Sequence, residues 1–278
     1  MSEEILINVT PQETRVSVMH QGAAQELHIE RTASRGLVGN VYLGRIVRIL
    51  PGMQSAFVEV GLERTAFLHV ADIWEAKQNG EPPKPIERMV FEGQSIMVQV
   101  IKDPIGTKGA RLSTQISVAG RMLVYLPQEK HIGISQRIEN EAEREALREK
   151  ITRLVPADEP GGFIVRTMAE SATEEELAND IEYLRKIWRD IKEHAKTMAP
   201  PSMLYQELSL GLRVLRDFVN PETDRIVIDS RENFGKLSAF ATEFTPTVKP
   251  LLDHYIGERP LFDLHGVEDE IHKAQPAT

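Results

Sequence analysis

The sequence predicts a multi-domain α+β protein in which a small antiparallel barrel and a mixed α+β unit interrupt a third, discontinuous domain. Three observations point to this architecture. Short runs of alternating apolar residues crowd residues 39–73, helical stripes dominate from residue 116 onward, and residues 203–273 contain too little strand to cover their own helices. A chain of 278 residues suits two or three small domains.

Residues 36–115 are predicted to form the barrel. Turn residues Pro51, Gly52 and Gly61 separate runs in which apolar side chains recur at every second position, a pattern typical of twisted antiparallel strands. The runs are Val41–Leu43, Ile46–Leu50, Ala56–Val60, Ala66–Leu68 and the later Gln94–Lys102. Strands of this length can close a five-stranded barrel. Residues 76–88, rich in proline and charge, are predicted to form an exposed loop.

Residues 1–33 and 203–273 are predicted to form one discontinuous domain. The first segment has three strand-like runs, 5–9, 14–18 and 26–30. The second has one convincing strand, Arg225–Ile228, and four predicted helices, at Leu204–Phe218, Phe234–Phe240, Pro246–His254 and Gly266–Lys273. Because helices must bury their apolar faces, we expect the N-terminal strands to supply the missing sheet.

Residues 116–200 have the pattern of a separate α+β unit. Arg137–Leu154 carries an apolar helical stripe with charged flanks, and Phe163–Val165 is predicted to be a strand. Thr173 and Glu176 have the spacing of a capping box, which predicts the start of a second helix. Pro200-Pro201 is expected to close the unit as a linker.

Composition limits the classes of function. The net charge of −9 argues against a protein that coats nucleic acid non-specifically. Residues 36–119, however, hold nine Lys/Arg against eight Asp/Glu, so any nucleic-acid contact is expected in a local groove of the barrel. The absence of cysteine excludes disulfides and thiolate metal sites. No apolar run has the length of a membrane span and no signal peptide opens the chain, so we expect a cytoplasmic location without membrane contact.

Two aromatic residues of the barrel are candidates for ligand contact. Phe57 and Phe67 lie close in sequence to the basic residues Arg45, Arg48 and Arg64. Aromatic faces next to cations suit an unpaired nucleic-acid strand. The alternative is that both rings fill the barrel core, as strand aromatics commonly do. The residues alone leave both interpretations open.

An ordered set of segments resembles the N-terminal half of the bacterial ribonuclease E/G family, nearer to its G branch. The segments are MSEEILINVTPQETRVSVMHQGAAQELHIER at 1–31, the alternating barrel pattern at 39–73, KDPIGTKGARLST at 102–114 and GGFIVRT at 161–167. The resemblance extends to about Lys273. It implies an OB-fold RNA-binding barrel of the S-one type at 36–115, a 5′-sensor domain at 116–200, and a ribonuclease-H-like domain without catalytic function at 1–33 and 203–273.

The resemblance also implies binding residues in the barrel. Phe57 and Phe67 occupy positions that stack on RNA bases in the family, and Lys108 occupies a position that contacts RNA. Stacking on an aromatic ring tolerates changes of base, so the implied ligand is single-stranded RNA with little sequence preference.

The resemblance implies a second set of binding residues, which would hold the 5′-terminal monophosphate of an RNA: Gly120, Val124, Arg166 and Thr167. Arginine suits this role because its planar fork meets two phosphate oxygens at once. Glycine lets the backbone approach a ligand closely. From the residues alone, Arg166-Thr167 has the simpler interpretation of a surface turn at a strand end.

We expect no catalytic residue, metal site or cofactor within these residues. The family's magnesium-binding Asp-x-Asn and zinc-binding Cys-x-x-Cys motifs do not occur, and the eight histidines form no HxH or HExxH pair. Five acids could be recruited to a metal, and a structural role is the favoured interpretation for them: Glu59, Asp72, Asp103, Asp224 and Asp229. The match ends abruptly before QPAT, which suggests a truncated form of a longer enzyme.

The expected function is therefore RNA binding and 5′-monophosphate sensing for an endoribonuclease that cleaves single-stranded RNA in rRNA maturation and mRNA decay. Cleavage is not expected from these residues alone. The alternative is a stand-alone, non-catalytic RNA-binding adaptor. Expected partners are single-stranded RNA, preferably 5′-monophosphorylated, with the family's catalytic half or other copies of the enzyme as candidates.

Overall fold

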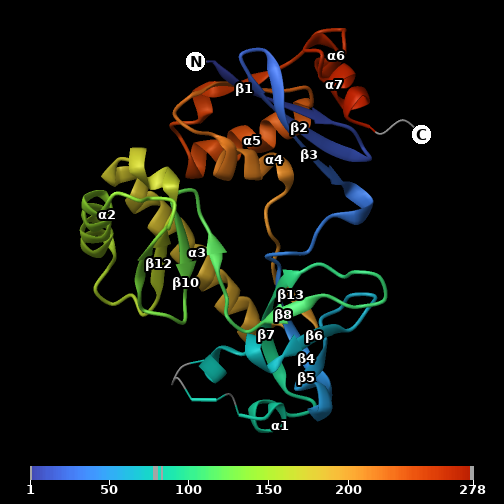
Figure 1. Ribbon diagram of the computed structural model, residues 1–278, viewed down its shortest axis with the longest axis vertical. Coiled ribbons are helices and arrows are strands. Elements are labelled where there is room, and N and C mark those ends of the chain that lie inside the picture. Colours follow the sequence, from blue (N-terminus) through green and yellow to red (C-terminus); the bar gives the residue numbers. More distant parts are fainter. Residues whose placement is uncertain (1, 78–80, 83, 276–278) are drawn as a thin grey trace. The chain divides into compact units, whose positions relative to one another are not determined.

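The computed structural model describes residues 2–77, 81–82 and 84–275, and many of its elements are labelled in Figure 1. The chain divides into two compact units. The split-chain unit comprises Met1–Arg35 and Leu208–Thr278, and the central unit comprises Gly36–Glu207. Both mix helices and strands, which confirms the predicted α+β class.

The split-chain unit is built on a five-stranded sheet of order β15-β14-β1-β2-β3. Its strands are β1 (Glu3–Val9), β2 (Glu13–His20), β3 (Ala23–Arg31), β14 (Thr223–Ile228) and β15 (Leu252–His254). The first three form an antiparallel meander, whereas β14 runs parallel to β1 and β15 parallel to β14. Segments far apart in sequence thus share one sheet.

Helices of the split-chain unit pack on residues from both faces of this sheet. They are α4 (Leu210–Arg213), continued by a π turn at Val214–Phe218, α5 (Arg231–Phe244), α6 (Leu261–Leu264) and α7 (Val267–Ala274). Ile5 and Ile7 of β1 belong to the core with Leu215 of the π turn and Leu237 of α5. Leu6, on the opposite face, belongs to the core beneath α6 and α7. The alternation along β1 therefore separates two apolar layers.

Residues 246–254 differ from the predicted helix. They form a 3-10 turn at Lys249–Leu251 followed by β15. Pro250 would fall inside a helix begun at Pro246, where it lacks an N–H donor and collides with the preceding turn. Pairing with β14 satisfies this backbone instead.

The predicted helix at Leu204–Phe218 also begins later than expected. Residues Ser202–Tyr205 form strand β13, which pairs with β4 of the barrel, and the helix starts at Leu210. Residues 203–207 consequently lie with the central unit, and Pro200-Pro201 precedes a paired strand. A strand pairing between residues about 160 positions apart leaves no signal in local periodicity.

The barrel of the central unit is closed by five strands. They are β4 (Val41–Leu50), β5 (Ser55–Glu59), β6 (Ala66–His69), β8 (Arg111–Ser113) and β7 (Ser95–Lys102), and β7 returns to pair with β4. This confirms the predicted five-stranded barrel. The predicted loop at 76–88 lies partly outside the described residues, and its described part includes α1 (Ile86–Met89) at one end.

The rest of the central unit is a four-stranded sheet with two long helices. The sheet has the order β11 (Ile132–Ile134), β12 (Gly162–Val165), β10 (Leu123–Leu126) and β9 (Val118–Ala119). The helices are α2 (Glu141–Leu154) and α3 (Glu174–Thr197), and both share its apolar core. The predicted capping box of Thr173 and Glu176 is confirmed. Helix α2 begins four residues later than predicted because the Asn140 side chain caps it.

A buried polar network joins this sheet to α3. The Glu159 side chain is 4% exposed and accepts hydrogen bonds from the Tyr125 hydroxyl at 2.5 Å, the Gly161 N–H at 2.9 Å and Arg185 Nε at 2.7 Å. Burial by itself raises the pKa of the Glu159 carboxyl, but these donors hold that pKa below its usual value. The network fixes the chain where β12 begins.

The first prediction concerns barrel closure. A Cβ on Gly109 would lie 2.0 Å from the Thr65 carbonyl oxygen, a backbone atom next to β6. We expect Gly109→Ala to lower the free energy of unfolding by about 1–3 kcal/mol, because the backbone must shift to admit the methyl group. Urea denaturation of Gly109→Ala beside Gly52→Ala, where a Cβ meets nothing within 4 Å, checks this. Equal stability of the two variants would contradict it.

The second prediction concerns Glu159. A carboxylate with a lowered pKa stabilises the fold fully above its unfolded pKa, and this stabilisation is lost as the pH falls through the folded pKa. We expect Glu159→Gln to cost about 1–3 kcal/mol at pH 7, and the difference from wild type to shrink below pH ~4. Glu182→Gln is the control, since exposed Glu182 also pairs with Arg185. A cost independent of pH would refute the assignment.

Candidate nucleic-acid interface

Phe57 and Phe67 form a cross-strand pair on the outside of the barrel. They lie directly opposite each other in the antiparallel pairing of β5 and β6. Their sequence neighbours Ala56, Val58 and Leu68 are fully buried in the barrel core, whereas both rings are half-buried. Since side chains alternate between the two faces of a strand, the rings point away from the core. The geometry provides two adjacent aromatic surfaces.

Lys108 lies in a short loop beside this pair. Backbone hydrogen bonds between Ile105 and Lys108 close the loop, and the Arg64 guanidinium donates to the Gly106 carbonyl within it. The Phe67 N–H donates to the Ala110 carbonyl at 2.8 Å, which ties the end of the loop to β6. The structure therefore brings Lys108 to the Phe67 side of the pair, with its side chain exposed.

Gly120 occupies a tight turn between β9 and β10 that closes around a buried acid. The Asp180 carboxylate of α3 accepts hydrogen bonds from the N–H groups of Arg121, Met122 and Leu123, at 3.1, 2.9 and 2.9 Å. A Cβ on Gly120 would lie 2.6 Å from both carboxylate oxygens. The glycine is thus required by the fold itself, apart from any ligand.

Arg166 lies against the same turn at the end of β12. Its N–H donates to the Met122 carbonyl at 2.8 Å, and Nη1 donates to the Gly120 carbonyl at 2.6 Å. Burial raises the pKa of the Asp180 carboxyl, and the three N–H donors with the Arg166 charge oppose that rise. Arg166 and Thr167 are both half-buried, and Thr167 begins a 3-10 turn.

Val124 completes the predicted set on the adjoining strand. It pairs with Ala119 of β9 on one side and Ile164 of β12 on the other. Its neighbours Leu123 and Tyr125 are buried in the core, so Val124 lies on the outer face of the sheet. The structure therefore brings Gly120 and Arg166 into direct contact, with Thr167 next in sequence and Val124 on the same sheet. Whether they hold a phosphate stays a prediction.

Sequence reasoning missed Asp180, although a signal was present. Asp180 falls between Leu177 and Ile181 on the apolar stripe of α3, where a charged residue is unusual. A carboxylate at such a position needs buried donors, and the β9–β10 turn supplies them.

Three of the five acids considered for a metal make structural hydrogen bonds within the central unit. Glu59 accepts from the Gly61 N–H, Asp103 from the Leu37 N–H and Asp72 from Arg111. Among the residues that the structure describes, no three acids or histidines gather as a metal site would require. These residues therefore do not fit a carboxylate cage for magnesium.

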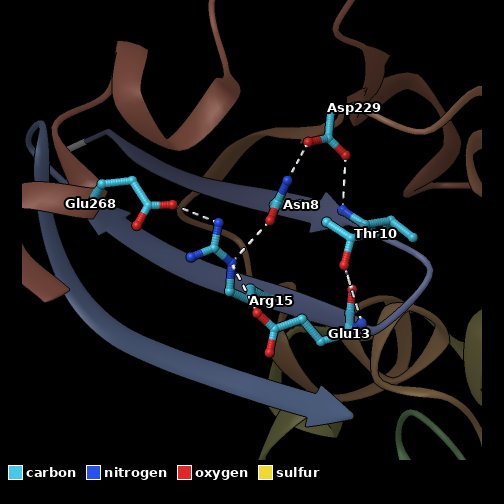
Figure 2. A network of polar contacts seen from close by, with 7 residues as sticks. Asn8, Thr10, Glu13, Arg15, Asp229 and Glu268 are labelled. Atoms are coloured by element: carbon cyan, nitrogen blue, oxygen red, sulfur yellow. Dashed lines mark hydrogen bonds and ion pairs between the residues drawn. The ribbon is translucent and has the colours of Figure 1, made fainter. Parts of the chain in front are cut away.

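Asp229 is held by the polar network of the split-chain unit that Figure 2 shows. Its Oδ2 accepts from Asn8 Nδ2 at 2.6 Å and its Oδ1 from the Val9 N–H at 2.9 Å. Arg15 Nε donates to Asn8 Oδ1 at 2.9 Å, and Arg15 Nη2 pairs with Glu268 of α7 at 2.6 Å. Both Asp229 oxygens thus join the ends of β1 and β14, and Arg15 extends the network to α7.

The helices in the described ranges are too short or too polar to span a bilayer.

Comparison with known proteins gives a consistent assignment. The model of the Ribonuclease E/G family matches residues 117–278. Ribonuclease G of Escherichia coli strain K12 is 49% identical over 281 residues, which cover 99% of this chain and 57% of that protein. Ribonuclease G of Haemophilus influenzae is 48% identical, covering 98% of this chain and 56% of the relative. Ribonuclease E of Nostoc sp. is 32% identical, covering 95% and 39%.

The chain thus spans a little over half the length of the ribonuclease G relatives it matches. The resemblance seen in its motifs and the family match over more than half of its residues agree, and the identity is higher to ribonuclease G than to ribonuclease E. On this evidence, the chain belongs to the ribonuclease E/G family.

Proposed function

We propose that this chain binds unpaired RNA on its barrel and receives a 5′-monophosphorylated RNA end beside Gly120 and Arg166. The observation that carries the proposal is the outward-facing pair of Phe57 and Phe67 on adjacent strands. Bases that are not held in a duplex can stack on such rings, and each stacked base contributes about 1–3 kcal/mol. A duplex offers no free base faces to this surface.

The second site is supported by the fixed position of Arg166. A bond from Nη1 to the Gly120 carbonyl sets the direction of the guanidinium, a planar cation whose geometry suits phosphate oxygens. Thr167 adds a hydroxyl next to it, and Val124 adds an apolar surface for the terminal nucleotide. A 5′-hydroxyl end gives these groups no charge to bind, so the site would distinguish the two ends.

At the level of the whole protein, we propose participation in endonucleolytic cleavage of single-stranded RNA, in rRNA maturation and mRNA decay in the cytoplasm. The support is the family membership and the identity of the similar proteins, which are named ribonuclease G and ribonuclease E. The proposed binding function requires no metal ion or cofactor, and we do not expect these residues alone to cleave RNA.

The proposed function also assigns a fold to each part of the chain. The closed five-stranded barrel supports an OB-fold, and the sheet order β15-β14-β1-β2-β3 supports a ribonuclease-H-like unit. In that assignment, residues 116–200 act as the 5′-sensor and the split-chain unit has no catalytic role.

The third prediction tests the aromatic pair. Phe57→Leu and Phe67→Leu keep an apolar side chain but remove the ring. Each should therefore weaken binding of a 5′-hydroxyl RNA oligonucleotide by about 5- to 150-fold, the equivalent of the stacking energy of one base. Fluorescence anisotropy gives the dissociation constants. Phe91→Leu is the control, because Phe91 is 65% exposed on the barrel outside the pair. The proposal fails for the barrel if all three variants bind as wild type does.

The fourth prediction tests the monophosphate site. Wild type should bind a 5′-monophosphorylated oligonucleotide about tenfold or more tightly than its 5′-hydroxyl counterpart, since charge-assisted hydrogen bonds contribute about 1.5–3 kcal/mol. Arg166→Gln should abolish the difference, and Arg166→Lys should restore part of it. Arg189→Gln, on the exposed face of α3, serves as control, and thermal melts check folding. Equal affinity of wild type for both ends would exclude the proposed sensor.

A further inference from the structure

The aromatic pair is the centre of a longer row of side chains that crosses the barrel. Pairing places Arg48 of β4 opposite Phe57, Phe57 opposite Phe67, and Phe67 opposite Arg111 of β8. Arg111 in turn lies opposite Lys102 of β7. Directly paired residues project from the same face of a sheet, so the five side chains form one transverse row. Each of the five barrel strands contributes one member.

Two β-bulges bring the terminal cations into the row. The register of β4 with β5 shifts between Ile46 and Arg48, so Arg48 takes the place opposite Phe57 that regular pairing would give to Val47. The register of β7 with β8 shifts between Val100 and Lys102, and Lys102 replaces Ile101 opposite Arg111 in the same way. Bulges re-aim side chains, and they are frequent beside functional sites. Here both exchange an aliphatic residue for a cation.

The charges of the row differ in how they are held. Arg48 and Lys102 are exposed, and neither has a carboxylate partner among the residues that the structure describes. Arg111 Nε is fixed by Asp72 at 2.8 Å, and the carboxylate is 12% exposed whereas the arginine is 39% exposed. Asp72 thus orients Arg111 beside Phe67 while the end cations remain available. Neighbouring strands lie ~4.8 Å apart, so the row spans roughly 19 Å across the barrel surface.

We propose that Arg48 and Lys102 bind backbone phosphates on the two sides of the Phe57–Phe67 pair, and that the RNA strand crosses the barrel strands along this row. The inference rests on the proposed RNA binding. It adds the path of the RNA strand over the barrel, the minimum length of RNA in contact and two residues that bind backbone phosphates. Bases stack at the centre, and phosphates meet cations at both ends. Arg111 faces the intervening backbone next to Phe67.

The test separates charge contacts from stacking by their dependence on salt. Each phosphate contact with a single strand contributes about 0.7 to the slope of log Kobs against log salt concentration. We expect Arg48→Gln and Lys102→Gln each to weaken binding several-fold and to reduce that slope by about 0.7. Phe57→Leu should weaken binding with the slope unchanged. The oligonucleotide used has a 5′-hydroxyl end, so that no terminal phosphate contributes to the measured salt dependence.

Matched controls remove exposed cations outside the row. Arg88→Gln changes a residue of α1 in the same barrel, and Lys192→Gln changes a residue of α3; both should retain the wild-type slope. If the Phe57 variant loses affinity while Arg48→Gln and Lys102→Gln keep the slope of the controls, the transverse path is overturned and RNA binding by the barrel stands. If wild type binds no RNA, the proposed function fails and this inference fails with it.

Discussion

Alternation along the strands of a closed barrel is the constraint on which the candidate interface depends. The interior of a five-stranded barrel is filled by small and aliphatic side chains such as Ala56, Val58 and Leu68, all fully buried. Once these residues face inward, their neighbours Phe57 and Phe67 must face outward. The stability of the barrel core and the exposure of the aromatic pair therefore both result from the same alternation of side chains. A register shift of one residue would exchange the two sets and destroy both core and surface.

The second candidate site depends on a buried carboxylate instead of on alternation. The Asp180 carboxylate accepts hydrogen bonds from three N–H groups of the β9–β10 turn and interacts electrostatically with Arg166. An internal anion offsets part of the arginine charge, so the attraction of the site for any anion is reduced. Directional hydrogen bonding then decides what binds there, and this favours a ligand whose oxygens match the guanidinium geometry.

Local sequence patterns predicted the strands of the barrel and the long helices, since these elements depend on periodicity and capping that a short window contains. The Thr173–Glu176 box and the apolar alternation around Phe57 are examples. Elements determined by distant partners were not predictable. Strand β13 exists because β4 offers it a free edge, and β15 exists because β14 does. Asp180 likewise became interpretable only once the turn that it caps was in place.

The bulges show the same limit at the level of a single side chain. Strict alternation through β4 would place Val47 opposite Phe57, and only the observed register puts Arg48 there. This detail matters because the whole chain carries a charge of −9, which repels a polyanion at long range. In the proposed binding of RNA, attraction must come from a few cations that lie close to the aromatic surface and are not neutralised by carboxylates. Two register shifts that each exchange an aliphatic side chain for a cation meet that requirement without altering the barrel core.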